Sequence, residues 1–163
     1  MQHSCENLER IDKAGEPFEV SLCAEDNLHL LMDMYEVFSP RPASQGLPPK
    51  DPEVCRKWVQ DLLSTGENIV ARRDGEILGH ASLIQDPRGE SAEFVIFVHQ
   101  MYRNRGIGTV LTAAAIERAK ELDLKSVWLT VSLSNYLAIK LYRKLGFQYC
   151  DMDDCERVMV IGL

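Results

Sequence analysis

The sequence predicts an α/β (α+β) domain in which helices flank a single mixed sheet. Apolar runs of strand length alternate with segments of helical spacing, and a Gly-rich turn joins the run FVIFV to a long Ala-rich helical segment. The length of 163 residues suits one domain with a sizeable core. We therefore expect residues 1–163 to form this one domain, with residues 1–16 as a loose N-terminal extension.

Helices are predicted where apolar residues recur every three or four positions. Four segments have this spacing: 25–38, 51–66, 109–122 and 134–147. The second has clear boundary signals, because Asp51 suits an N-cap, Pro52 suits the first helical position and Gly66 can close the end.

Strands are predicted for the short apolar runs between turn signals. Six segments qualify: 18–23, 68–73, 76–85, 91–100, 125–131 and 156–163. Asp74-Gly75, between the second and third, is a strong hairpin signal. The Pro/Gly/Ser-rich segment 39–50 is a predicted loop. The resulting order is β-α-α-β-β-β-α-β-α-β.

Composition excludes several functional classes. A formal net charge of -7 argues against general nucleic-acid binding, which needs clustered Lys and Arg. No apolar run approaches the ~20 residues of a membrane span, and the polar N-terminus is unlike a signal peptide. The five scattered cysteines form no CxxC pair, so we expect no metal site and a cytoplasmic protein with reduced thiols.

The stretch RNRGIG, residues 103–108, stands between a predicted strand and a predicted helix. It is neither a dinucleotide fingerprint, because Leu111 replaces the third glycine, nor a P-loop. The unpaired N–H groups of a helix N-terminus nevertheless bind anions. The two glycines allow close backbone approach, and the two arginines add permanent charge. The stretch therefore indicates a phosphate or pyrophosphate site, the alternative being a structural turn with two solvated arginines.

A second motif follows in the last predicted helix, and the two together resemble the GCN5-related N-acetyltransferase (GNAT) superfamily. The first signature, [Gln/Arg]-x-x-Gly-x-[Gly/Ala], is matched by Arg103, Asn104, Arg105, Gly106, Ile107 and Gly108. The second, an Asn followed two turns later by LY-x-x-x-GF, is matched by Asn135, Leu141, Tyr142, Gly146 and Phe147. The resemblance covers residues 93–147, and the N-terminal half matches in layout only.

The resemblance implies a single N-acetyltransferase domain with a mostly antiparallel sheet, in which two splayed central strands hold acetyl-CoA. The pyrophosphate would bind the turn at 103–108. The pantetheine arm would bond to the strand at Ile96, Phe97 and Val98, and also to Asn135. Tyr142 would protonate the departing CoA thiolate, and the Val98 N–H would stabilise the oxyanion.

The general base is less well defined by the resemblance. Some relatives carry a glutamate in the strand before the conserved Asn, where this chain has Thr130, which cannot serve. Glu93 lies near the place used by other relatives and is our favoured candidate, one residue out of register. A water-mediated route and His99 are the alternatives.

The predicted partners are acetyl-CoA and an amine acceptor, either a small molecule or a peptide or protein amine. Segment 39–50 would border the acceptor site, and relatives are often homodimers. A function of another class also fits the motifs, an acyl-CoA-binding sensor or regulatory module without turnover. Retention of Tyr142 argues against that alternative, because a pure binder needs no acid.

Overall fold

The computed structural model describes residues 7–39, 48–152 and 156–163. Their strands are β1 (Leu8–Ile11), β2 (Pro17–Leu22), β3 (Glu67–Arg73), β4 (Glu76–Gln85), β5 (Ser91–Val98), β6 (Ser126–Ser132), β7 (Gln148–Met152) and β8 (Glu156–Gly162). Their helices are α1 (Leu28–Glu36), α2 (Pro52–Thr65), α3 (Ile107–Glu121) and α4 (Tyr136–Lys144), with short 3-10 turns at Glu25–Asn27 and Gln100–Tyr102. None of these helices is long and apolar enough to cross a membrane.

In the described residues the strands form one sheet in the order β1-β2-β3-β4-β5-β6-β8-β7. Every neighbouring pair is antiparallel except β5 and β6, which run parallel. The expected mixed, mostly antiparallel sheet is thus confirmed. The final strand β8 pairs within the chain, between β6 and β7.

Two strands, β1 and β7, are additional to the six predicted. β1 lies in the expected loose extension, yet its residues Leu8 to Ile11 pair with β2 along their whole length. The expectation of a loose extension is therefore wrong for residues 8–11. β1 was missed because all four of its residues are exposed, so no apolar alternation marks it.

Two boundaries predicted from local sequence signals, the start of α2 and the β3–β4 hairpin, are present in the structure. The Asp51 carboxylate accepts hydrogen bonds from the N–H groups of Glu53 and Val54 at 3.0 Å each, which is a true N-cap for α2. Asp74 and Gly75 have φ values of 50° and 79°. Positive φ at both central residues is what a tight hairpin between β3 and β4 requires.

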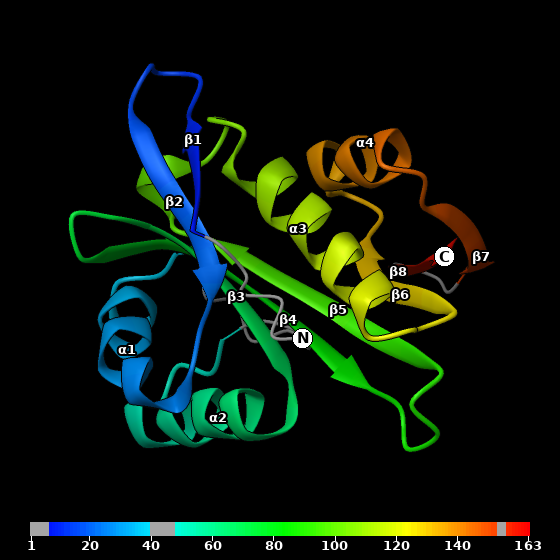
Figure 1. Ribbon diagram of the computed structural model, residues 1–163, viewed down its shortest axis with the longest axis horizontal. Coiled ribbons are helices and arrows are strands. Elements are labelled where there is room, and N and C mark those ends of the chain that lie inside the picture. The colour runs from blue at the N-terminus through cyan, green and yellow to red at the C-terminus, as the bar shows by residue number, and fades with distance from the viewer. Residues whose placement is uncertain (1–6, 40–47, 153–155) are drawn as a thin grey trace.

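The helices cover the two faces of the sheet in pairs, with α1 and α2 on one face and α3 and α4 on the other (Figure 1). Beneath α3 and α4 lies the larger core, which includes Leu83, Leu111, Leu129 and Met159. Beneath α1 and α2 lies a second core rich in aromatic rings, centred on the fully buried Tyr35.

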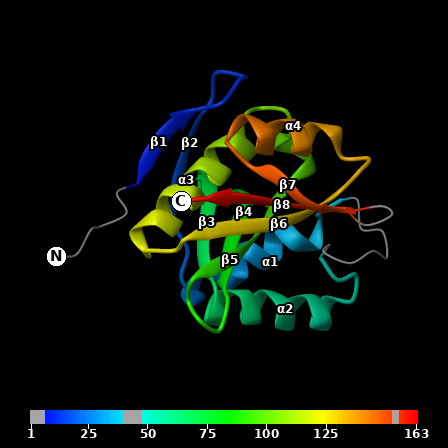
Figure 2. The same ribbon diagram turned by 90° about the vertical axis from the view of Figure 1, so that its right-hand side faces the viewer.

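The pairing of β5 with β6 ends early. It covers only Ser91, Ala92 and Glu93 of β5, whereas β4 stays paired with β5 as far as Val98. Beyond Glu93 the two strands separate, and β6 and β8 cross the molecule at an angle to β3, β4 and β5 (Figure 2). The expected pair of splayed central strands is therefore present.

A buried hydrogen-bonded chain ties α1 and α2 to the sheet. The Asn68 amide donates to the carbonyls of Leu62 and Gly66, at 2.8 and 3.0 Å, which sets its orientation. Its oxygen then accepts from His80 Nε2 at 2.8 Å, and His80 Nδ1 accepts from the Tyr35 hydroxyl at 2.7 Å. His80 is thus held neutral, and burial lowers its pKa to about 4.

We expect this histidine to make the fold sensitive to acid. The unfolded chain protonates His80 near 6.5, but the folded protein only near 4, so the favoured neutral form stabilises the fold above pH 6.5. Between these values the free energy of unfolding falls with decreasing pH, by about 3 kcal/mol in total. Denaturant unfolding of the wild type at several pH values in this window measures the loss.

His80→Gln and the exposed control His29→Gln separate this contribution from those of other titrating groups. The control should retain the wild-type pH dependence, whereas His80→Gln should lack most of it. Equal slopes for the two variants would contradict the assignment.

Candidate active site

The separation of β5 from β6 leaves backbone groups of β5 directed into the gap. The His99 N–H donates to the Leu78 carbonyl of β4 at 2.9 Å, so His99 and Phe97 direct their backbone groups toward β4. Ile96 and Val98 therefore direct theirs toward the gap. Of Ile96, Phe97 and Val98, the three strand residues predicted to bond the pantetheine arm, two have backbone groups that face the gap and Phe97 does not.

Glu93 is the last residue of β5 that pairs with β6, so its side chain lies where the gap begins. Along β5, Phe94, Ile96 and Val98 pack on the α3 side. Glu93 alternates with them and lies on the α1 side, half-buried. Burial raises the pKa of its carboxyl, and no described residue hydrogen-bonds to it. It can accept a proton from a group that approaches from this face.

The glycine turn begins α3 at the open end of the gap. Gly106 is the N-cap, with a left-handed φ of 88° that favours glycine. Gly108 needs neither a positive φ nor extra room, since an added β-carbon would lie 3.6 and 3.7 Å from Leu141 and Val98, at ordinary contact distances. Packing within the protein therefore does not require glycine at position 108, whereas a ligand lying on the helix N-terminus would.

Arg103 lies against the gap rather than out in solvent. Its Nε donates to the Val98 carbonyl at 3.0 Å, and its guanidinium lies 5.2 Å from the centre of the Phe38 ring. Partial burial lowers its pKa without removing its charge. The Val98 carbonyl thus already accepts one hydrogen bond, and the Val98 N–H also faces the gap.

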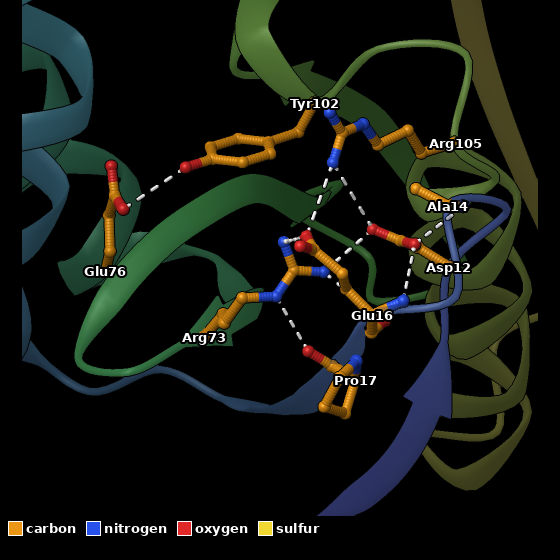
Figure 3. Close-up of polar contacts among 8 residues, drawn as sticks. All are labelled: Asp12, Ala14, Glu16, Pro17, Arg73, Glu76, Tyr102 and Arg105. Atoms are coloured by element: carbon orange, nitrogen blue, oxygen red, sulfur yellow. Dashed lines mark hydrogen bonds and ion pairs between the residues drawn. The ribbon is translucent and has the colours of Figure 1, made fainter.

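Arg105 contacts the turn between β1 and β2, which sequence reasoning did not include in the site. Its Nη1 lies 3.8 Å from Asp12 and 3.5 Å from Glu16, and both carboxylates also bind Arg73 (Figure 3). The guanidiniums of Arg73 and Arg105 lie over the Tyr102 ring, at 5.8 and 5.6 Å from its centre. The Arg105 side chain therefore holds the N-terminal hairpin against the glycine turn.

Tyr142 lies in α4 and Asn135 precedes its first residue, and the protein satisfies the hydrogen-bonding groups of these two motif residues to different extents. The Tyr142 ring packs edge-on against Phe94 and Phe147, and burial raises its pKa to about 12. No described residue hydrogen-bonds to its hydroxyl, which thus remains available to a ligand. The Asn135 side-chain oxygen caps α4 by accepting from the Ala138 N–H at 3.3 Å.

The side chain of His99, the alternative base, hydrogen-bonds to local backbone and faces another cavity. Its Nδ1 accepts from the Met101 N–H at 3.1 Å, and burial lowers its pKa. It lines a cavity of about 320 Å³ between α1 and the β3–β4 turn, away from Glu93 and Tyr142. A second cavity, of about 500 Å³, lies between α4 and β8. Most of the predicted acceptor loop, residues 40–47, lies outside the described residues.

Comparison with known proteins gives a consistent family. The model of the Acetyltransferase (GNAT) family matches residues 29–147. Streptothricin acetyltransferase of Streptomyces lavendulae is 29% identical over 118 residues, which are 64% of this chain and 62% of that protein. The chain thus spans about three-fifths of that relative's length.

Two solved structures share the fold. The GNAT domain of S. lividans PAT has a TM-score of 0.84 at 17% identity, covering 96% of this chain and 97% of that one. The structure of yncA from Salmonella typhimurium with its cofactor acetyl-CoA has a TM-score of 0.71 at 16% identity, covering 90% and 94%. At these identities the likeness establishes a common architecture.

The two glycines of the turn should respond differently to substitution by alanine. Gly106→Ala places a side chain at a left-handed φ and should lower the free energy of unfolding by about 1–2 kcal/mol. Gly108→Ala meets no clash and gains helix propensity, so its stability should equal or slightly exceed that of the wild type. Denaturant unfolding of both variants measures the difference, and equal losses would contradict this account of the turn.

Proposed function

Because the chain belongs to the Acetyltransferase (GNAT) family, we propose that it transfers an acetyl group from acetyl-CoA to a primary amine. The observation that carries the proposal is the gap between β5 and β6. Glu93 stands on one face where it begins, and the unbonded Tyr142 hydroxyl belongs to the other. A thioester in the gap could therefore meet a base from one side and an acid from the other.

The residues around the gap fit acetyl-CoA as the co-substrate. The free N–H groups at the start of α3 suit its pyrophosphate, and Gly108 gives the room that close approach needs. The gap-facing backbone of Ile96 and Val98 suits the amides of the pantetheine arm. The yncA structure, solved with acetyl-CoA in the same fold, supports acetyl-CoA as the co-substrate.

In the proposed reaction a neutral amine attacks the acetyl carbonyl, and the carbon–sulfur bond breaks as the carbon–nitrogen bond forms. The Val98 N–H stabilises the negative charge that develops on the carbonyl oxygen. Glu93 takes the proton that the amine loses, directly or through a water molecule. Tyr142 protonates the departing thiolate, which its raised pKa permits because the phenol is fully protonated at neutral pH.

We propose a primary amine as acceptor, without choosing between a small molecule and a peptide. The relative named for streptothricin makes a small-molecule amine the first candidate to assay, followed by free amino acids and peptide N-termini. We further propose a cytoplasmic location. It is supported by Cys23 and Cys150, which are free thiols in the described part of the chain.

The cofactor and the acid can be tested together with Tyr142→Phe. Calorimetric titration should show the variant binding acetyl-CoA and CoA as tightly as the wild type, and neither protein binding ATP comparably. The loss of one hydroxyl without a protein partner should leave stability nearly unchanged. Turnover with an accepted amine should fall about 100-fold, because the thiolate must leave without a proton donor.

Each result of that experiment has a distinct meaning. Undiminished turnover by Tyr142→Phe would remove Tyr142 from its role as acid. Binding of acetyl-CoA without turnover on any amine would favour a sensor module over an enzyme. No binding by the wild type would overturn the proposed function.

The pH dependence of catalysis tests Glu93. The carboxyl must be ionised to accept a proton, and burial raises its pKa above the ordinary value. We therefore expect kcat/KM to fall as pH decreases through this raised pKa, and Glu93→Gln to lose about 100-fold in rate together with that limb of the profile. A Glu93→Gln variant with the wild-type profile would leave a water-mediated route as the explanation.

A further inference from the structure

We propose that Lys13, on the turn between β1 and β2, binds a phosphate group of CoA together with the N-terminus of α3. This inference rests on the proposed function, because it adds a residue to the site assigned to acetyl-CoA. Lys13 lies outside both sequence signatures and outside the family match at 29–147. Its assignment comes from its position and from the charges around it.

The position of Lys13 is fixed at the glycine turn. Its backbone N–H donates to the Arg105 carbonyl at 2.9 Å. Its Cε and Cγ lie 3.7 and 3.8 Å from the point where a β-carbon on Gly106 would be. The aliphatic stem thus lies along the residue that caps α3. The ammonium group is one bond beyond Cε, within reach of a ligand bound at the unpaired N–H groups of the first helical turn.

The charges of the β1–β2 turn and of Arg105 are paired with one another, and the Lys13 ammonium group is left without a carboxylate partner among the described residues. Arg73 binds Asp12 and Glu16 at 2.8 and 3.0 Å, and Arg105 lies 3.8 and 3.5 Å from the same two carboxylates (Figure 3). Two positive and two negative groups therefore neutralise one another. Lys13 forms no ion pair with any described residue, so its charge is available to a ligand.

The turn that carries Lys13 is held rigidly. The Asp12 carboxylate, fully buried, accepts from the N–H groups of Ala14 and Glu16 at 2.8 and 3.0 Å, and these bonds help to lower its pKa. The Gly15 N–H donates to the Asp12 carbonyl at 3.0 Å. A lysine on a preorganised turn loses little backbone freedom when it binds a phosphate. Arg105 acts in this site as a positioning residue, because it fastens the turn through Asp12.

The test compares Lys13→Gln with Lys120→Gln, which removes the same charge from the exposed far end of α3. Both variants and the wild type are titrated calorimetrically with CoA and with 3′-dephospho-CoA, at low and high salt. Lys13→Gln should bind CoA about 5- to 10-fold more weakly than the control, because a charge-assisted bond to phosphate is lost. The deficit should shrink at high salt.

The two ligands identify which phosphate is bound. A deficit that persists with 3′-dephospho-CoA assigns Lys13 to the pyrophosphate, and one that disappears assigns it to the 3′-phosphate. Equal affinity of Lys13→Gln and Lys120→Gln for CoA, with unchanged melting temperatures, would overturn the inference and leave the proposed function standing. Failure of the wild type to bind CoA would overturn both.

Discussion

The early end of the pairing between β5 and β6 is the constraint on which the rest of the structure depends. A fully paired sheet would have no free backbone at its centre, because every N–H and C=O would be used by a neighbouring strand. By pairing only as far as Glu93, the chain exposes a strip of β5 inside the molecule. Three features lie beside this strip and take their proposed roles in cofactor binding and catalysis from that position: the glycine turn, the start of α3 and the Tyr142 hydroxyl.

Among the described residues, the two halves of the divided sheet lack hydrogen bonds to each other beyond Glu93, and apolar packing holds them together. The core beneath α3 contains Leu83 from β4 together with Leu129 from β6 and Met159 from β8, so one helix covers both halves. Burial of these side chains stabilises the divided sheet without hydrogen bonds across the gap. On the opposite face, the bonded chain through Tyr35 and His80 fixes the position of the helices that flank the proposed acceptor side.

The sequence predicted what local chemistry determines and missed what depends on distant partners. Asp51 and Asp74 mark a helix start and a hairpin because each acts on neighbouring backbone, and the structure contains both features. Strand β1 is exposed and is held by its pairing with β2, so its own residues carried no signal. For the candidate site, the signatures named residues to consider, but the contact of Arg105 with Asp12 joins segments far apart in the chain. Spacing along a sequence does not reveal such pairs.

The divided sheet also has a consequence for how the chain folds. Strands β1 to β5 occupy residues 8–98 and β6 to β8 occupy residues 126–162, so each half is continuous in sequence and antiparallel within itself. Contacts between near neighbours form faster than distant ones, which favours two separate folding units that dock through α3. The gap is then the seam between those units. A ligand that bridges it would stabilise the docked state over the separated units.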